Sequence, residues 1–320
     1  MSRYDRQAIL PEVGADGQAR LAAAHVLVVG AGGLGATVLP ALAGAGIGRI
    51  RILDPDRVEE SNLHRQTLYR MDDLGQHKAD CAARELTRLN PACRVEPVAA
   101  RLTAGTAAAM LDGVGLVIDA ADSFAVTYIL SDLCRDRRIP LIAASVLGRA
   151  GHAGGFCGTA PSYRALFPDL PSSAASCATA GVMGPAVAAV GALQAQMALG
   201  VLLGHAPSPL GQCVTLDLAQ WRFASFRFDG APEPGAGSFP FLSPDALASG
   251  DTVVELRDTC EAPVPVVPGA LRLSPGQVTG WQPPPGRVVL CCRSGVRAWR
   301  AAQVLAARGH GALAVLAEAG

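Results

Sequence analysis

The sequence lacks an excess of charge of either sign, and it lacks paired cysteines. Its 320 residues contain 27 Lys plus Arg and 27 Asp plus Glu, so the formal net charge is zero. A balanced charge argues against a general nucleic-acid coat or an anionic membrane as the partner. The nine cysteines include no C-x-x-C pair, and the chain is too long for a small disulfide scaffold. We therefore expect free thiols and a cytoplasmic protein.

The first residues also lack a secretory signal. Residues 1–10 include three charged side chains and no apolar core. One long apolar stretch, residues 180–204, would be long enough to span a membrane. It contains Pro185 and two glutamines, so we expect a buried helix at this place and no membrane partner.

Short apolar runs alternate with helical stretches over most of the chain. Strands are expected at residues 25–29, 49–53, 95–99, 115–119 and 140–144. The helices between them, such as residues 78–89, predict an α/β fold with a Rossmann-like, doubly wound and mostly parallel sheet. Residues 212–217 and 221–228 predict an antiparallel pair after it.

A Pro/Gly-rich segment, residues 229–240, predicts a linker between two domains. The first domain is expected to comprise residues 1–228. Residues 241–320 predict a second, small α/β domain. Its expected elements are strands at 252–256 and 287–290 and a helix at 298–308.

A glycine-rich turn follows the first expected strand. Gly30, Gly32, Gly33 and Gly35 form a G-x-G-x-x-G pattern whose bare backbone lets phosphates approach a helix N-terminus. Asp54 ends the next strand, where a carboxylate can accept hydrogen bonds from ribose hydroxyls. These features alone fit an NAD-dependent Rossmann oxidoreductase about as well as an ATP-using enzyme.

The residues that follow Asp54 favour phosphate chemistry. Arg65 and Lys78 can offset the charge that builds on an α-phosphate and on pyrophosphate, and the carboxylate of Asp122 suits Mg²⁺. Hydride transfer needs none of these groups, and the sequence has no convincing acid/base centre for it. Asn62 and Gln66 follow in the same polar segment.

These motifs resemble the ThiF, MoeB and HesA adenylyltransferases of the E1-like activating-enzyme superfamily. The matching stretches run in collinear order over about residues 1–228, at 3–7, 30–35, 54–66, 75–78, 119–123 and 177–183. The resemblance implies that ATP is used to adenylate the C-terminal glycine carboxylate of a ubiquitin-like sulfur-carrier protein. Such carriers end in Gly-Gly and serve thiamin or molybdenum cofactor biosynthesis.

The resemblance also assigns roles to individual residues. Asp122 would position Mg²⁺. The residues that would hold ATP are the glycine turn, Asp54, Asp56, Ser61, Asn62, Arg65, Gln66, Lys78 and Ser123. Arg6 would reach the ATP of the neighbouring subunit, which implies a homodimer. A chain that binds a ubiquitin-like partner without catalysis is a further alternative.

The sequence departs from the family at two places. Family members commonly hold a structural zinc with two C-x-x-C pairs, whereas residues 162–165 read Ser-Tyr-Arg-Ala and no later pair exists. We therefore predict no zinc site. Ser123 stands where Asn is usual, which predicts weaker nucleotide binding.

Two cysteines are candidates for sulfur chemistry. Cys177 precedes the apolar stretch, where a helix N-terminus lowers a thiol pKa, and the resemblance gives it covalent chemistry with the carrier. The string Cys-Arg-Ser-Gly-Val-Arg at 292–297 resembles the active loop of a rhodanese-like sulfurtransferase. That resemblance implies a persulfide on Cys292, loaded by a donor such as a cysteine desulfurase, with Cys291 as the last core residue of the strand. We expect a truncated rhodanese-like domain, and an inert buried cysteine is the alternative at each position.

Overall fold

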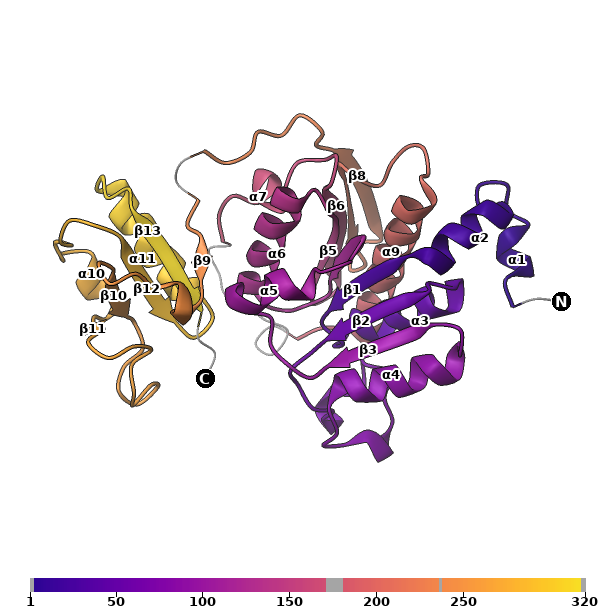
Figure 1. Cartoon of the computed structure of the whole chain (residues 1–320), viewed down its shortest axis with the longest axis horizontal. Coiled ribbons are helices and arrows are strands. Elements are labelled where there is room, and N and C mark those ends of the chain that lie inside the picture. The colour runs from indigo at the N-terminus through magenta and orange to yellow at the C-terminus, as the bar shows by residue number, and fades with distance from the viewer. Residues whose placement is uncertain (1–2, 171–180, 236–237, 318–320) are drawn as a thin grey trace.

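The computed structural model describes residues 3–170, 181–235 and 238–317, which form two α/β units (Figure 1). The helices and strands of the first unit are, in chain order, α1 (Asp5–Ala8), α2 (Gly14–Ala23), β1 (His25–Val29), α3 (Gly35–Ala45), β2 (Arg49–Leu53), η1 (Glu60–Asn62), η2 (Met71–Asp73), α4 (Lys78–Leu89), β3 (Arg94–Val98), α5 (Ala104–Met110), β4 (Leu116–Asp119), α6 (Phe124–Arg137), β5 (Pro140–Leu147), β6 (Ala150–Cys157), α7 (Tyr163–Leu166), α9 (Gly184–Leu203), β7 (Gln212–Asp217) and β8 (Arg222–Arg227). Those of the second unit are β9 (Phe241–Leu242), η3 (Pro244–Ala246), β10 (Thr252–Glu255), β11 (Leu271–Arg272), α10 (Pro275–Val278), β12 (Val288–Cys292), α11 (Val296–Ala307) and β13 (Leu313–Ala317).

The first unit is built on an eight-stranded sheet with the order β3-β2-β1-β4-β5-β6-β7-β8. Neighbours from β3 to β5 are parallel, and β5 to β8 are antiparallel. The expected Rossmann-like, mostly parallel sheet is thereby confirmed, with the antiparallel pair β7 and β8 at one edge. The sequence did not predict β6, because its glycines have low strand propensity and only pairing with β5 and β7 makes it a strand.

Helices cover both faces of this sheet (Figure 1). Helices α3, α4 and α9 pack on one face, and α5, α6 and α7 lie on the other. Helix α9 is long and apolar enough to cross a membrane, but more than half of it is buried. Val187 and Val190 of α9 belong to the core beneath α3, so within the described residues α9 packs as a core helix.

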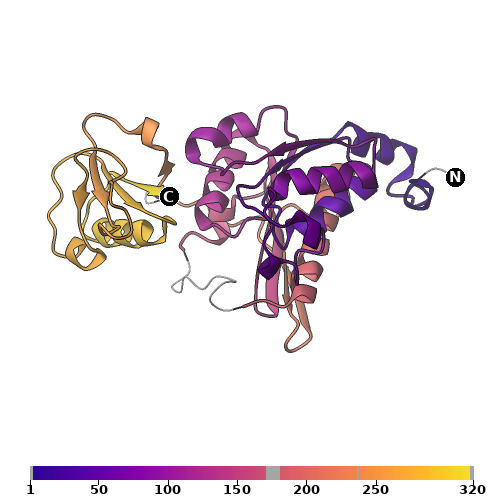
Figure 2. The same ribbon diagram turned by 90° about the horizontal axis from the view of Figure 1, so that it is seen from below.

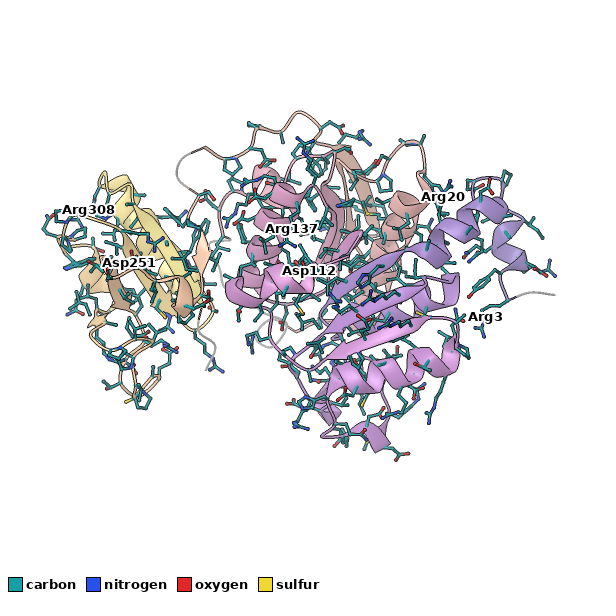
Figure 3. The ribbon with its side chains drawn as sticks, viewed as in Figure 1. Arg3, Arg20, Asp112, Arg137, Asp251 and Arg308 are labelled. Atoms are coloured by element: carbon teal, nitrogen blue, oxygen red, sulfur yellow. The ribbon has the colours of Figure 1, made fainter. Side chains whose placement is uncertain are left out.

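The two helices α5 and α6 are also joined at their surface. Arg137 at the end of α6 donates from Nη1 to the Ala108 carbonyl at 2.9 Å and lies 3.5 Å from the Asp112 carboxylate. Arg137 and Asp112 are close to each other in Figure 3. This exposed contact joins α5 and α6 on the face that the second unit meets.

The second unit is a five-stranded parallel sheet with the order β11-β10-β12-β13-β9. Strand β12 extends to Cys292, two residues beyond the predicted end, and α11 starts at Val296 rather than at residue 298. Cys292 is therefore the last residue of a buried strand and not the first residue of the loop. Strand β13 was not predicted from the sequence.

The two units share an apolar core. Buried side chains under α6 are continuous with those of α11 and β12. Strand β9 lies between α6 and the rest of the second sheet (Figure 1), and it contacts α5 and α6. Figure 2 shows the second unit against the α5–α6 side of the first from below.

Candidate active site

The glycine turn lies at the carboxyl ends of β1 and β4, where ligands bind in open α/β sheets. Gly30 has φ +98°, and a Cβ there would lie 2.5 Å from the Ala120 carbonyl oxygen. A Cβ on Gly35 would lie 2.1 Å from the Gly30 oxygen. These two glycines allow the turn to pack tightly. A Cβ on Gly32 would meet only Gln66, at 3.7 Å, so the backbone of Gly32 is open to a ligand.

Asp54 holds this turn in place from the end of β2. One carboxylate oxygen accepts a hydrogen bond from the Ala31 N–H at 2.7 Å, and the other accepts one from the Asp56 N–H at 2.8 Å. Burial raises the pKa of Asp54, although these two bonds and the Lys78 charge oppose that rise. The carboxylate predicted to bind ribose thus also orders the backbone of the phosphate turn.

Lys78 is buried at the first position of α4. Its backbone N–H donates to the Asp56 carbonyl at 2.9 Å, and its side-chain Nζ donates to an Asp56 carboxylate oxygen at 3.0 Å. An ammonium has three N–H donors, and in the described part of the chain Asp56 is the one acceptor found for it. Two donors remain for an anionic ligand, and the exposed Asp56 fixes their direction.

The segment 61–66 adds polar groups beside the glycine turn. Arg65 donates from Nη1 to the Ser61 carbonyl at 3.1 Å and contacts His64 Nε2 at 2.7 Å, and its stem lies 3.8 Å from where a Cβ of Gly33 would be. The residue as a whole is partly buried, and its two guanidinium contacts are exposed. Arg65 therefore lies next to the turn with most of its donors unused.

Two buried amides belong to the same segment. Asn62 donates to the Ser61 hydroxyl at 3.3 Å. Gln66 lies against Gly32, and its Oε1 has no hydrogen-bond partner among the described residues. A buried amide oxygen without a partner is costly, which suits a position that a ligand completes.

The turn after β4 carries Asp119, Asp122 and Ser123. Asp119 is fully buried and accepts hydrogen bonds from the Ala121 N–H at 3.1 Å and the Thr127 hydroxyl at 2.5 Å. Burial, with a smaller contribution from the Asp122 charge, raises the pKa of Asp119 to about 6. Asp122 is exposed, and no hydrogen bond or ion pair to another described residue holds it. Ser123 is the N-cap residue of α6 without a side-chain capping bond.

The donor chemistry of this turn fits Mg²⁺, which prefers carboxylate oxygens and retains several waters. Asp122 offers an exposed carboxylate, and the buried Asp119 next to it adds negative potential. Gln194 of α9 donates to the Asp119 carbonyl at 2.7 Å and to the Ile142 carbonyl at 3.1 Å, so α9 is bonded to the end of β4 and to the neighbouring strand β5. Sequence reasoning missed this role, although a glutamine in an apolar helix was a signal for it.

Two predicted residues stand apart from this group. Arg6 is exposed on α1, which packs against α2. Cys177 lies outside the described residues.

Ser162, in the segment where the sequence predicts no zinc site, makes two hydrogen bonds. Ser162 donates from N and Oγ to the two carboxylate oxygens of Glu233, at 2.7 and 2.6 Å. Within the described ranges no group of three or more His, Cys, Asp or Glu could hold a metal ion. These contacts link α7 to the segment that leaves β8.

The sulfur of Cys292, at the end of β12, reaches the first turn of α11. Its Sγ accepts a hydrogen bond from the Ala298 N–H at 3.3 Å, and the residue is fully buried. Arg293 and Ser294, which follow it in the loop, are exposed. A thiolate or persulfide at this position would receive N–H groups of the first helical turn, as the resemblance requires.

The fold and the site define a Rossmann-like nucleotide-binding enzyme whose cations and carboxylates suit phosphate chemistry. The model of the ThiF family matches residues 4–236, and the chain therefore belongs to that family.

Named relatives agree with this assignment. A sulfur carrier protein adenylyltransferase of Thermus thermophilus is 44% identical over 235 residues, which cover 71% of this chain and 86% of the relative. A SAMP-activating enzyme E1 of Haloferax volcanii is 38% identical over 235 residues, which cover 73% of this chain and 87% of the relative. An adenylyltransferase and sulfurtransferase UBA4 of Yarrowia lipolytica is 35% identical over 274 residues, which cover 83% of this chain and 68% of the relative.

A solved structure supports the fold. Escherichia coli MccB matches with a TM-score of 0.64 at 23% identity, covering 73% of each chain. At this identity the likeness shows the fold alone.

Proposed function

We propose that this chain uses ATP to adenylate the C-terminal glycine carboxylate of a ubiquitin-like sulfur-carrier protein and then helps convert it to a thiocarboxylate. The observation that carries the proposal is the buried Lys78 ammonium beside the glycine turn that Asp54 orders. The names of the relatives, which include adenylyltransferases and sulfurtransferases, support the same reaction. Residues 1–228 would adenylate, residues 229–240 would link, and residues 241–320 would carry sulfur.

The adenylation step needs positioning and charge stabilisation rather than a side-chain base. The carrier carboxylate is already ionised, so its oxygen attacks the α-phosphorus while the bond to pyrophosphate breaks. Arg65 and Lys78 would stabilise the charge on the α-phosphate and the departing pyrophosphate. Mg²⁺, when bound, would neutralise phosphate charge, and Asp122 would hold it.

For the sulfur step, we propose that Cys292 carries the persulfide, as the rhodanese-like resemblance implies. The terminal sulfur of a Cys292 persulfide attacks the acyl carbon, and the bond to AMP breaks. A thiolate, which the resemblance assigns to Cys177, then attacks the Cys292 sulfur, releases the thiocarboxylate and forms a disulfide. An external thiol must reduce that disulfide before the next cycle.

The setting of the reaction is also part of the proposal. We propose a homodimer in which Arg6 reaches the partner's nucleotide, a cytoplasmic location and a cysteine desulfurase as the sulfur donor. The exposed position of Arg6 on α1 is compatible with such a reach.

Pyrophosphate exchange into ATP, in the presence of a Gly-Gly carrier from the same genome, tests the first step. Arg65→Ala should slow exchange about 100-fold, since removing one preorganised donor typically costs that much. Arg88→Ala, an exposed arginine on α4, is the matched control and should exchange at the wild-type rate. Undiminished exchange in Arg65→Ala would remove Arg65 from the mechanism.

Binding measurements separate the two alternatives. In a titration of the protein with NADH and with ATP, NADH binding without ATP binding would favour the oxidoreductase. Carrier binding without pyrophosphate exchange would favour a non-catalytic scaffold.

A further inference from the structure

One arginine joins the two units. Arg164 of α7 is fully buried, and its Nε and Nη2 donate to the two carboxylate oxygens of Asp132 on α6, at 2.6 and 2.9 Å. Its Nη2 also reaches the Phe239 carbonyl, at 3.4 Å, just before β9. A single guanidinium thus contacts the first unit and the chain that enters the second.

Two aromatic rings complete its environment. The guanidinium carbon lies 4.4 Å from the Tyr128 ring centre on α6 and 5.1 Å from the Trp299 ring centre on α11. The Nη1 atom has no hydrogen-bond partner in the part of the chain that is described, so the ring faces are its surroundings. Desolvating a guanidinium is costly unless its partners are well placed. The Trp299 ring and the Phe239 carbonyl are the parts of this environment that depend on how the second unit lies against α6.

Aromatic packing extends the same contact. Trp299 lies 5.3 Å from Tyr128, 4.9 Å from Phe239 and 6.1 Å from Phe241, between ring centres. On the exposed side of the interface, Gln303 of α11 donates to Asp169 at 2.7 Å.

The loop after Cys292 lies next to this contact. A Cβ on Gly295 would be 2.7 Å from the Phe241 ring, so the loop packs directly on β9. Trp299 is in the first turns of α11, whose Ala298 N–H holds the Cys292 sulfur. Cys292, Trp299 and Tyr128 of α6 thus belong to one buried cluster.

The adenylation site lies at the start of the same helix. Asp122 precedes α6, and Tyr128 is six residues further on, about 9 Å at ~1.5 Å per helical residue. Tyr128 contacts Trp299 of α11, so the adenylation site and the sulfur site border the same helix.

We propose that Arg164 is a positioning residue that holds the second unit on α6, so that one docked carrier passes its tail from the adenylation site to Cys292 of the same chain. This inference rests on the proposed function. Arg164 contacts neither ATP nor the reacting sulfur, and it acts through Asp132, Tyr128 and Trp299.

Three rates measured on the full chain test it. They are pyrophosphate exchange, sulfur loading of Cys292 from thiosulfate as a gain of one sulfur by mass spectrometry, and thiocarboxylate formation on a Gly-Gly carrier from the same genome. Arg164→Met should leave pyrophosphate exchange and sulfur loading within about twofold of the wild-type rates. It should lower the turnover number of thiocarboxylate formation at least tenfold with an unchanged KM for the carrier, because only this coupled step needs the two units in their correct relative orientation.

Control variants separate positioning from folding. Arg88→Met makes the same change at an exposed arginine of α4 and should leave all three rates unchanged. If Arg164→Met misfolds and loses both pyrophosphate exchange and sulfur loading, the Arg164→Lys variant provides the test. Lysine keeps the charge but cannot make both bonds to Asp132. It should reduce thiocarboxylate formation alone.

A variant with intact partial rates and wild-type thiocarboxylate turnover would overturn the inference and leave the proposed function standing. A wild-type chain that exchanges no pyrophosphate, or takes no sulfur on Cys292, would refute the proposed function itself.

Discussion

The buried carboxyl of Asp119 gives the sharpest test of the electrostatics of the site. Its pKa is raised from 3.8 to about 6, chiefly by burial. A shift of about 2 units corresponds to about 3 kcal/mol, since one unit is 1.36 kcal/mol. The native state holds this proton between pH 4 and 6 and the unfolded state does not. The free energy of unfolding from this group therefore falls as pH rises through that window and is constant above it.

Asp119→Asn should remove this cost without breaking the network. The amide oxygen can still accept from Ala121, its NH₂ can donate to the Thr127 hydroxyl, and that hydroxyl can turn to the Ser123 carbonyl, which lies 3.3 Å away. At pH 8 the variant should be more stable than the wild type by about 3 kcal/mol, and at pH 5 by about 1.5 kcal/mol.

Urea unfolding at pH 5 and pH 8 measures the difference. Asp112→Asn, at an exposed carboxylate of the same unit, supplies the baseline for losing a surface charge. A stability gain that is equal at both pH values, or a variant less stable than the wild type at pH 8, would contradict a buried, ionised Asp119.

Three further substitutions test the local geometry. Gly30→Ala should weaken ATP binding at least tenfold in a titration, because its φ of +98° and a carbonyl 2.5 Å from the new Cβ oppose it, whereas Gly44→Ala in open space should not. Asp54→Ala should lower the free energy of unfolding by roughly 2 to 6 kcal/mol in urea, since two backbone N–H groups lose their acceptor at about 1 to 3 kcal/mol each; a loss below 1 kcal/mol would contradict this. Ser162→Ala should cost about 1 to 3 kcal/mol in the same assay through the bond to Glu233, and an unchanged midpoint would show that this bond is not stabilising.

Most elements near the nucleotide could be predicted from local pattern. The glycine turn, the strand that ends before Asp54 and the helix that starts at Lys78 all follow from short-range periodicity, and α4 has the predicted bounds Lys78–Leu89. Strand β13 was missed because Leu313–Ala317 is rich in alanine and leucine, which also suit a helix. Pairing with β12 and β9 in the folded protein makes this segment a strand.

The contacts that join distant segments could not be predicted. Ser162 and Glu233 are 71 residues apart, and Arg164 meets Trp299 from another unit. No short-range pattern encodes these pairs, because they depend on how α7 and α11 approach α6. The same holds for Gln194, whose carbonyl partners lie on two different strands.

The continuous core under α6 has a consequence for handling the protein in pieces. A gene segment encoding only the first unit would produce a chain with Tyr128 and the apolar side of α6 in water, and the separated second unit would expose Trp299 and Phe241. Each half would then carry a bare aromatic surface of the sort that drives aggregation. We therefore expect each half to be poorly soluble when it is expressed alone and soluble when both halves are co-expressed.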